Sequence, residues 1–465
     1  MKRRLILVAI LAIALTTEGA HAATFANWSQ YLYSAKHASE NPTATTITPA
    51  NASTLKQVWK FTPDAGAIPG LGGFYASPTV YNGVVYIGAR NGYFYALNET
   101  SGVVIWKRFI GYVSPTTCGP EGFTSTATVK PDPTTGRTTV YVYGATGYLY
   151  ALDAATGNNV WSPAAVAIPS QTQNDYYAWG SPLVTGGNVY VPISSQCDKP
   201  LVRGGLLEFS QATGALENSY YSTPPGTVGA SIWSSPMSSG SSIFVTTGNG
   251  PANPSDAYSI VKLSTALSKS DMWTVPVSER DADGDFGASP GMWSATLGGT
   301  LTKMVGACNK NGIFYAFKVQ SLSAGPVWSL RVGNPDSVGP GQCDAGPVWD
   351  GSRLFLAGDG TTINSVAYDG SMLRVDPATG AVIWQTGVTG SIIGTPGMDG
   401  SGVIAAATYG STTSQNGLFL IDAATGQILK TISYSAAQTF GQPVFADRYL
   451  LVASRGNGLR AYTTS

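Results

Sequence analysis

The stretch Gly92-Tyr-Phe-Tyr-Ala-Leu-Asn-Glu-Thr-Ser-Gly-Val-Val-Ile-Trp106 decides the fold of this chain. Residues 92–97 alternate aromatic with small or aliphatic residues, and residues 103–106 form a β-branched run that ends in tryptophan. Both runs are typical of short β-strands. The polar, glycine-closed segment 98–102 between them has the chemistry of a tight turn. We therefore predict a β-hairpin over residues 92–106.

The same hairpin recurs along the chain, and each copy follows a segment that opens with Ser-Pro or a variant of it. These opening positions are Ser77, Ser125, Ser181, Ser235, Ser289, Gly346, Thr395 and Gln442. Their spacing of roughly 47 to 57 residues is close to the period of one β-propeller blade. Each full unit supplies four strands, so the pattern predicts a propeller of four-stranded blades.

The eighth unit is incomplete, because the sequence ends after residues 458–462 without an outer strand. The run from Leu55 to Phe61 near the N-terminus is a spare strand that contains a tryptophan. If this strand completes the last unit, the ring closes and no edge stays unpaired between the first and last blades. The sequence therefore predicts an all-β, eight-bladed β-propeller as a single domain over residues 23–465.

The first 22 residues have the pattern of an export signal. Basic residues 2–4 precede an apolar run over residues 5–15, and Ala20-His-Ala22 offers a small-x-small cleavage site. The apolar run is short for a membrane span, and no later stretch reaches spanning length. We therefore predict a cleaved signal peptide over residues 1–22, no membrane span, and a periplasmic or secreted protein.

Charge and histidine content narrow the classes of function. Lys+Arg and Asp+Glu are both 26, so the net charge is zero and there is no basic stripe to bind nucleic acid. Only two histidines occur, and His21 belongs to the predicted signal, which leaves His37. A single histidine disfavours a Ser-His-Asp triad and histidine-based metal sites. Most hydrolase mechanisms are thereby disfavoured.

The four cysteines are Cys118, Cys197, Cys308 and Cys343. An even number in an exported protein favours disulfides, with buried free thiols as the alternative. Four cysteines permit three pairings, of which proximity in the sequence favours Cys118–Cys197 with Cys308–Cys343. None lies in a Cys-x-x-Cys motif or precedes a histidine, so the sequence predicts neither c-type haem attachment nor a zinc ribbon.

Residues that recur from unit to unit are assigned to the scaffold. Asp153, Asp376 and Asp422 share one turn position, where a carboxylate can accept backbone N–H bonds. Tryptophans recur at one place after the turn, and we expect them to pack between blades. They are Trp106, Trp161, Trp273, Trp328 and Trp384. Because a ligand site is not repeated eight times, we expect the function to reside where copies depart from the pattern.

The Tyr-Ala-Leu-Asp-x-x-x-Gly-x-x-x-Trp core of the repeat resembles that of the quinoprotein (PQQ) repeat family, over nearly the whole mature chain. The opening Trp28…Tyr31…Leu55…Trp59 is similar to the start of quinoprotein alcohol dehydrogenases and of polyvinyl-alcohol-dehydrogenase-like proteins. The resemblance implies an eight-bladed propeller that can hold pyrroloquinoline quinone (PQQ) and Ca²⁺ at the mouth of its axial channel.

Three departures from the repeat match binding positions of that family. Trp233, just before an inner strand, matches a tryptophan on which the planar quinone stacks; a core tryptophan is the alternative. Asn249 in Thr-Thr-Gly-Asn-Gly matches an asparagine whose carbonyl oxygen ligates Ca²⁺, although asparagine also suits a left-handed turn. Asp198, shifted in register, is the nearest match to a second, carboxylate ligand of Ca²⁺.

The reacting groups that the resemblance implies lie near the fifth unit. Lys310 falls where the family has a cation that hydrogen-bonds the reactive quinone oxygens, and a solvated turn lysine is the alternative. Asp281 or Asp283, in the densest acidic cluster, matches the aspartate that acts as base. The histidine and tryptophan that frame that aspartate in the family have no counterpart here, and neither does the pair of adjacent cysteines.

Two hypotheses of function result. The first is a PQQ- and Ca²⁺-dependent oxidoreductase that acts on a small-molecule alcohol or a polymer hydroxyl, without haem because the sequence shows no haem domain. The second is a non-catalytic propeller that binds an extracytoplasmic protein or glycan. Convergence of Trp233, Asn249, Lys310 and the acidic loop at one mouth of the channel would favour the first.

Overall fold

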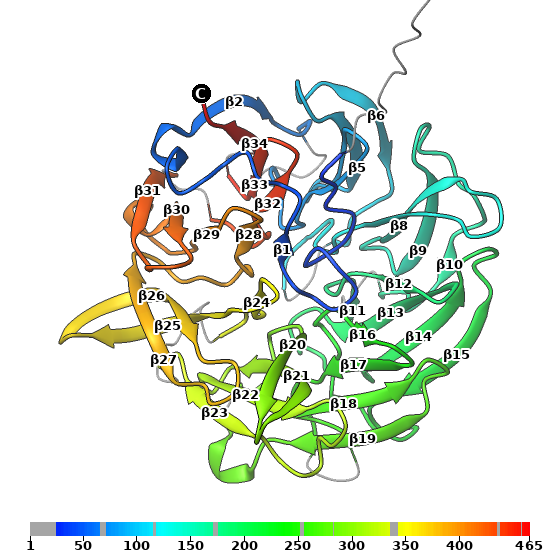
Figure 1. Cartoon of the computed structure of the whole chain (residues 1–465). Helices are drawn as coiled ribbons and strands as arrows, with labels where there is room; N and C mark the ends of the chain where they lie inside the picture. The colour runs from blue at the N-terminus through cyan, green and yellow to red at the C-terminus, as the bar shows by residue number, and fades with distance from the viewer. Residues whose placement is uncertain are drawn as a thin grey trace, which may run out of the picture.

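The computed structural model describes residues 25–65, 71–114, 118–170, 175–251, 255–281, 283–334, 343–434, 438–456 and 458–465. These residues form eight sheets that stand around a common axis (Figure 1). Short 3₁₀ turns lie between strands, namely η1 (Ala52–Thr54), η2 (Val277–Glu279) and η3 (Thr413–Gln415). The predicted signal peptide lies outside the described residues. None of the helices in the described ranges is long and apolar enough to cross a membrane.

The first four sheets each run from an inner to an outer strand in the order of the sequence. Their strands are β3 (Thr79–Tyr81), β4 (Val84–Gly88), β5 (Tyr93–Asn98) and β6 (Val104–Phe109); β7 (Thr128–Pro131), β8 (Thr138–Tyr143), β9 (Tyr148–Asp153) and β10 (Ala164–Ala165); β12 (Leu183–Thr185), β13 (Asn188–Ser195), β14 (Gly205–Ser210) and β15 (Leu216–Tyr221), with β11 (Tyr176–Tyr177) added beside β13; and β16 (Met237–Ser239), β17 (Ser242–Thr246), β18 (Ser259–Ser264) and β19 (Lys269–Thr274).

Three further sheets repeat this order, and the eighth begins in the same way. Their strands are β20 (Gly291–Leu297), β21 (Thr300–Asn309), β22 (Ile313–Lys318) and β23 (Trp328–Arg331); β24 (Val348–Trp349), β25 (Leu354–Ile363), β26 (Val366–Val375) and β27 (Val382–Val388); β28 (Gly397–Asp399), β29 (Val403–Ala407), β30 (Gly417–Asp422) and β31 (Ile428–Ser433); and β32 (Val444–Ala446), β33 (Tyr449–Ser454) and β34 (Gly458–Thr463).

The fourth strand of the eighth blade comes from the other end of the chain. β2 (Lys56–Phe61) pairs antiparallel with β34, with Trp59 opposite Ala461, and Figure 1 shows the two strands side by side. This pairing joins the ends of the ring and removes the open edge that an incomplete blade would expose. The predicted eight-bladed propeller, closed by the strand from Leu55 to Phe61, is therefore confirmed.

The recurring tryptophans pack between blades, as predicted. The indole of Trp59 covers the turn glycine Gly102 of the next blade, and its Nε1 donates a hydrogen bond of 2.8 Å to Glu99 O. The same indole-on-glycine contact recurs in the pairs Trp106–Gly157, Trp161–Gly214, Trp328–Gly380 and Trp384–Gly426. Trp273 instead packs against the rings of Tyr315 and Phe317. The repeated turn glycine is thus a docking site for the neighbouring blade.

Replacing Gly157 with alanine is expected to destabilise the propeller by about 2–4 kcal/mol. Its φ of +72° is unfavourable for alanine, and a Cβ would lie 2.7 Å from Trp106 Cε3. Gly186→Ala is the matched control, because its φ of +63° carries the same strain but no atom lies within 4 Å of a Cβ. Urea unfolding should show a loss of only about 1–2 kcal/mol for the control. Equal losses in both variants would contradict the docking role.

The aspartates at the shared turn position have the predicted structural role. Asp153 Oδ1 accepts the backbone N–H groups of Ala155 and Thr156, at 3.1 and 3.0 Å. The carboxylates of Asp376 and Asp422 accept the corresponding pairs of N–H groups in their own turns. Each carboxylate replaces the backbone partner that the turn lacks.

Residues 26–41 cross the axis and hydrogen-bond to the innermost strands, an arrangement that the repeat pattern does not predict. Their strand β1 (Glu40–Asn41) pairs parallel with β28 in the middle of the ring (Figure 1). Trp28 exchanges two hydrogen bonds of 2.9 Å with Val80. Carbonyl groups of the segment accept the N–H groups of Val129, Ser238, Met292, Trp349 and Met398. The segment therefore connects blades on opposite sides of the ring.

His37 lies in this crossing segment and is expected to make stability fall in mild acid. Burial lowers its pKa from 6.5 to about 4, although a hydrogen bond of 2.7 Å between Nδ1 and Pro290 O opposes the shift. Below pH 6.5 the unfolded chain therefore binds a proton that the folded chain excludes until about pH 4. We expect this residue to cost about 2 kcal/mol of stability between pH 7 and pH 5.

The measurement compares urea unfolding of the wild type and His37→Gln at both pH values. Buried acids with raised pKa values, such as Glu40 and Glu99, shift stability in the opposite direction with pH. They are present in both proteins, so their effect cancels in the difference. A difference between the two proteins that does not change with pH would contradict the prediction.

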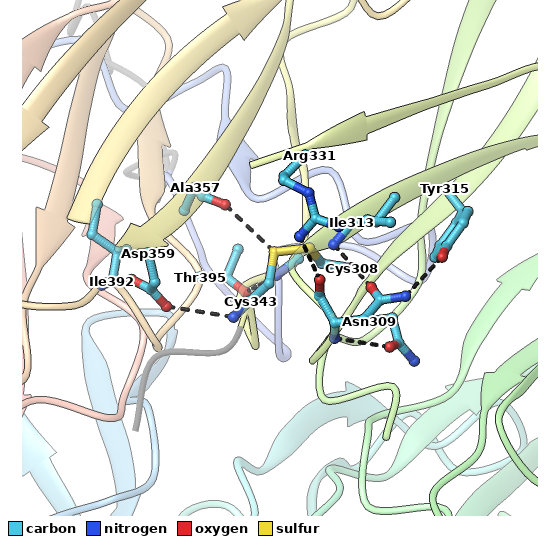
Figure 2. The surroundings of a disulfide bond; sticks show 12 residues. Cys308, Asn309, Ile313, Tyr315, Arg331, Cys343, Ala357, Asp359, Ile392 and Thr395 are labelled. Carbon is cyan, nitrogen blue, oxygen red and sulfur yellow. Dashed lines mark hydrogen bonds between the residues drawn. A yellow bond between two sulfur atoms is a disulfide. The ribbon is translucent and has the colours of Figure 1, made fainter. Parts of the chain in front are cut away.

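Both disulfides favoured by sequence proximity are present. Cys118 pairs with Cys197, with Cα atoms 6.1 Å apart, and Cys308 pairs with Cys343 at 5.6 Å. Figure 2 shows the second, which joins the end of β21 in the fifth blade to the segment before β24 in the sixth. The prediction of disulfides is confirmed, and no free cysteine occurs in the described ranges.

Candidate functional site

A cavity of about 440 Å³ lies on the propeller axis, bounded by the loops that precede the inner strands. All eight blades contribute to it, and one residue from each in turn is Tyr75, Thr124, Trp179, Trp233, Asp285, Asp344, Ile393 and Phe440. Tyr31 of the crossing segment also lines it. A cavity of this size is in the range of small-molecule and cofactor sites.

Hydroxyl groups at the Ser-Pro positions accept backbone hydrogen bonds from the neighbouring blade around part of this cavity. The backbone N–H groups of Ser77, Thr126, Ser181 and Ser235 donate to the hydroxyls of Thr126, Ser181, Ser235 and Ser289, respectively, at 2.9–3.0 Å. In the second blade Thr126, and not Ser125, therefore has this role. The recurring serine is thus explained by contact between adjacent blades, and we assign it no binding function.

Lys310 and Trp233 lie against each other on one side of the cavity. Lys310 Nζ is 5.0 Å from the centroid of the Trp233 ring, a cation–π arrangement. The lysine sits in the turn between β21 and β22, where its backbone N–H donates to Asp285 O at 2.8 Å. This bond fixes the turn against the acidic loop, so that the ammonium points at the carboxylates of Asp283 and Asp285.

Three aspartates converge beside Lys310. Lys310 Nζ lies 3.0 Å from Asp283 Oδ2 and 3.4 Å from Asp285 Oδ2. One carboxylate oxygen each from Asp198, Asp283 and Asp285 lies within 4.8 Å of the others, a geometry that could hold a metal ion. Asn249 Nδ2 donates to Asp283 Oδ1 at 3.0 Å and to Asp198 Oδ2 at 3.4 Å. Asn249 therefore belongs to the same cluster.

Lys310 and the aspartates of this cluster shift one another's pKa values. Burial raises the pKa of Asp285 to about 6, with Lys310 opposing the shift and Asp283 and Asp198 adding to it. Burial also raises the pKa of Asp283, but Lys310 and Asn249 outweigh it and lower the net value. Burial lowers the pKa of Lys310, but the nearby carboxylates outweigh burial and raise the pKa above its ordinary value. The ammonium therefore stays charged.

Four carboxyl groups and one ammonium line the cavity in the described ranges. Besides the three aspartates of the cluster, Asp344 contributes a carboxyl whose pKa burial raises, and its Oδ1 is buried without a hydrogen-bond partner there. When these groups are ionised, one ammonium cannot neutralise them all, and a bound cation would favour their ionised forms. The lining is therefore suited to a metal ion or another cation.

Most of the predicted site residues meet in this cavity. Asp198, Trp233, Asp283 and Lys310 line it, and Asn249 donates hydrogen bonds to three of its carboxylates, including one of 2.7 Å from its backbone N–H to Asp285 Oδ1. Asp281 is exposed and does not line the cavity, although the sequence offered it as a candidate base. The Cys118–Cys197 disulfide reaches the cavity through Cys197, which neighbours Asp198 in the chain.

Two lining carboxyls were not singled out from the sequence. Asp285 stands two positions after Asp283 in the acidic loop, and this Asp-x-Asp spacing was the available signal. Asp344 follows Cys343 directly, and no sequence signal distinguished it. Its position becomes clear only when the sixth blade is placed beside the fifth.

The fold and the cavity define a class: an eight-bladed propeller with an acidic, tryptophan-lined site at one mouth of its axis. The family model described as outer membrane protein assembly factor BamB (PQQ_2) matches residues 44–282 and 316–465. The match covers most of the chain, which therefore belongs to this family. The stretch between the two matched segments, residues 283–315, contains Asp283, Asp285 and Lys310.

The chain is also similar to dehydrogenases. A polyvinyl alcohol dehydrogenase of Sphingopyxis sp. (strain 113P3) is 25% identical over 389 residues, which is 75% of this chain and 51% of that protein. The chain thus spans about half the length of this relative.

Solved structures share the fold at low sequence identity. The quinohemoprotein alcohol dehydrogenase of Comamonas testosteroni has a TM-score of 0.71 and 17% identity, over 94% of this chain and 80% of that one. A europium-containing methanol dehydrogenase gives 0.71 and 14%, over 94% and 98%. BamB of Moraxella catarrhalis gives 0.55 and 14%, over 88% and 99%. These likenesses show the fold.

The prediction of no haem was wrong. Two solved structures that share the fold are quinohemoprotein alcohol dehydrogenases, whose name records a haem group. The prediction rested on the lack of a recognisable haem domain and of a Cys-x-x-Cys-His motif, and that motif marks only covalent c-type attachment. The absence of this motif gives no information on haem that is bound in any other way.

Proposed function

We propose that this protein is a PQQ-dependent oxidoreductase of the alcohol dehydrogenase type. The proposal rests mainly on one observation: one axial cavity is lined by Trp233, Lys310 and the carboxylates of Asp198, Asp283 and Asp285. An aromatic face, a fixed cation and a cluster of hard oxygen donors are what a planar quinone and a hard metal ion require together.

The donor set fits a hard cation. We assign Asp198, Asp285 and Asn249 as its ligands. Asn249 Oδ1 is buried and has no hydrogen-bond partner among the described residues, while Nδ2 faces the carboxylates. A rotation of the amide would present the oxygen to an ion in the cluster. Carboxylate and amide oxygens suit Ca²⁺, and the europium-containing relative makes Eu³⁺ a second ion to test.

The quinone would lie on the Trp233 ring. Its Nε1 is buried and unpartnered among the described residues, which leaves a hydrogen-bond donor available at the edge of the ring. Lys310 would donate hydrogen bonds to the quinone oxygens, where a fixed positive charge stabilises the charge that develops on reduction. When bound, the quinone supplies the two-electron acceptor for the alcohol.

Asp283 is the base in this proposal. Its lowered pKa keeps the carboxylate ionised at neutral pH, so that it can accept the hydroxyl proton of the alcohol. With a side chain 57% exposed, Asp283 is the most accessible of the three acidic groups to an incoming substrate, whereas Asp285 is 6% exposed. The substrate would be a small-molecule alcohol or a hydroxyl of a polymer, as in the similar polyvinyl alcohol dehydrogenase.

We also propose that the protein works outside the cytoplasm, as a single propeller domain over residues 23–465 after removal of residues 1–22. Two disulfides support this location, because disulfides persist in oxidising compartments. Mass determination of the protein after expression with its leader tests the cleavage, and an intact N-terminus in the exported fraction would contradict it.

A dye-linked oxidation assay tests the activity. Purified protein is supplied with PQQ, with either Ca²⁺ or Eu³⁺, and with alcohols from methanol to polyvinyl alcohol. We expect dye reduction that requires both PQQ and a metal ion, with Lys310→Met and metal-free protein as controls. No reduction with any alcohol, in protein shown to bind PQQ and metal, would contradict the activity.

The second candidate is a non-catalytic scaffold that binds a protein or a glycan. It is favoured by the family model described as an outer membrane protein assembly factor, and by the shared fold of BamB from Moraxella catarrhalis. Affinity capture with extracytoplasmic extract tests it. A stable partner that Trp233→Ala and Lys310→Ala leave bound would favour the scaffold, whereas loss of the partner with either variant would place binding in the cavity.

A further inference from the structure

Lys310 and the proposed metal ion share the carboxylate of Asp285, and the second carboxylate beside the ammonium, Asp283, belongs to the same acidic cluster. The ammonium lies 3.0 Å from Asp283 Oδ2 and 3.4 Å from Asp285 Oδ2, and both residues belong to the group of oxygens that could hold an ion. A metal ion among these oxygens would stand within a few ångströms of Nζ. Like charges at such a separation repel strongly when both are largely shielded from water. The Lys310 side chain is only 15% exposed.

Asp344 is an alternative partner for the displaced ammonium. It lines the same cavity, and its Oδ1 is buried without a hydrogen-bond partner among the described residues. Asp344 is also one of the carboxylates that favour the charged form of Lys310. Asp344 and the Trp233 ring meet at Gly287, where a Cβ would lie 1.8 Å from Asp344 Oδ1 and 2.9 Å from Trp233 Cη2.

We propose that Lys310 is an exchangeable counter-ion. Without metal its ammonium neutralises Asp283 and Asp285, and a metal ion held by Asp198, Asp285 and Asn249 turns it toward Asp344 and the face of Trp233. The inference rests on the metal site of the proposed function, but it does not require quinone. The four-carbon stem of lysine permits the movement, and Nζ already lies 5.0 Å from the Trp233 ring centroid.

The exchange would make Lys310 available as a hydrogen-bond donor only after a metal ion is bound. In the metal-free protein the ammonium is engaged by two carboxylates and is a poor donor to anything lying on Trp233. In the metal-loaded protein it is released from them and faces the aromatic ring. Metal binding would then precede binding of a ligand that needs a hydrogen bond from Lys310.

Titration of the full-length protein with Eu³⁺ alone, followed by luminescence, tests the exchange. Lys310→Met removes the competing charge and should tighten Eu³⁺ binding about tenfold. Asp344→Asn removes the second partner and should weaken binding about fivefold in the wild-type background, but much less in the Lys310→Met background. The non-additive part of this double-mutant cycle measures how far Lys310 and Asp344 act together on metal binding. Asp399→Asn, a buried carboxyl that does not line the cavity, should change nothing.

Additive effects in the cycle, or unchanged affinity in Lys310→Met, would overturn the exchange while leaving the metal site in place. Circular dichroism confirms that each variant is folded before titration. If no variant binds Eu³⁺ or Ca²⁺, both the exchange and the metal site are wrong. Separate titrations with PQQ then report on the quinone part of the proposed function, so the two failures are distinguishable.

Discussion

Asp283→Asn is expected to lower kcat for alcohol oxidation about 10³-fold at saturating metal and quinone. Asparagine preserves the shape of the side chain and removes the carboxylate, which the proposals use as the base for the hydroxyl proton and, without metal, as a partner of Lys310. General bases contribute about 10²–10⁴-fold to the rates of such reactions. The measurement is steady-state dye reduction, with PQQ affinity followed separately by quenching of tryptophan fluorescence.

Asp281→Asn is the matched control, because Asp281 stands two positions away, is exposed and does not line the cavity. We expect its kcat to stay within about twofold of the wild type, since solvated groups outside a site contribute little to the chemical step. The pair of variants therefore decides between the two bases that the sequence offered. A large loss in Asp281→Asn with full activity in Asp283→Asn would reverse the assignment.

Trp233→Ala is expected to weaken PQQ binding about 100-fold, or about 3 kcal/mol, with a much smaller change in metal affinity. The substitution removes the aromatic surface on which the quinone would lie and leaves the carboxylate cluster intact. A truncated side chain at the cavity wall also admits water to the face of the ligand. Isothermal titration of metal-loaded protein with PQQ measures the loss.

Two variants control this result. Trp233→Phe keeps an aromatic face and should lose less than about tenfold in affinity. Trp349→Ala removes a half-buried tryptophan in β24 that does not line the cavity, and should leave PQQ binding unchanged. Equal PQQ affinity in Trp233→Ala and the wild type would remove Trp233 from the site.

The fold could be predicted because the sequence pattern of one blade recurs along the whole chain. Five blades repeat the turn glycine on which a neighbouring tryptophan packs, as Trp106 does on Gly157, so the repeat reflects a contact between blades. The broken last unit and the spare strand β2 gave the closure of the ring. Residues 26–41 occur once, and their path across the axis depends on partners scattered over the whole chain, so no local pattern foretold it.

The site was predicted in part, and the misses have a common cause. Trp233, Asn249 and Lys310 were found because each breaks the repeat at a position that a resemblance could interpret. Asp198 was out of register with the family pattern, yet it reaches the cluster beside the disulfide-bonded Cys197. No sequence motif surrounds Asp344, and only the structure shows that its Oδ1 is buried without a hydrogen-bond partner among the described residues.

Titration of metal-loaded protein with PQQ tests the central claim most directly, namely that the axial cavity is a joint site for a metal ion and a quinone. We predict binding of one PQQ per chain at micromolar concentration or tighter in the presence of Eu³⁺ or Ca²⁺, and much weaker binding after the metal is removed with chelator. Absence of PQQ binding at millimolar concentration, with metal bound, would contradict the account.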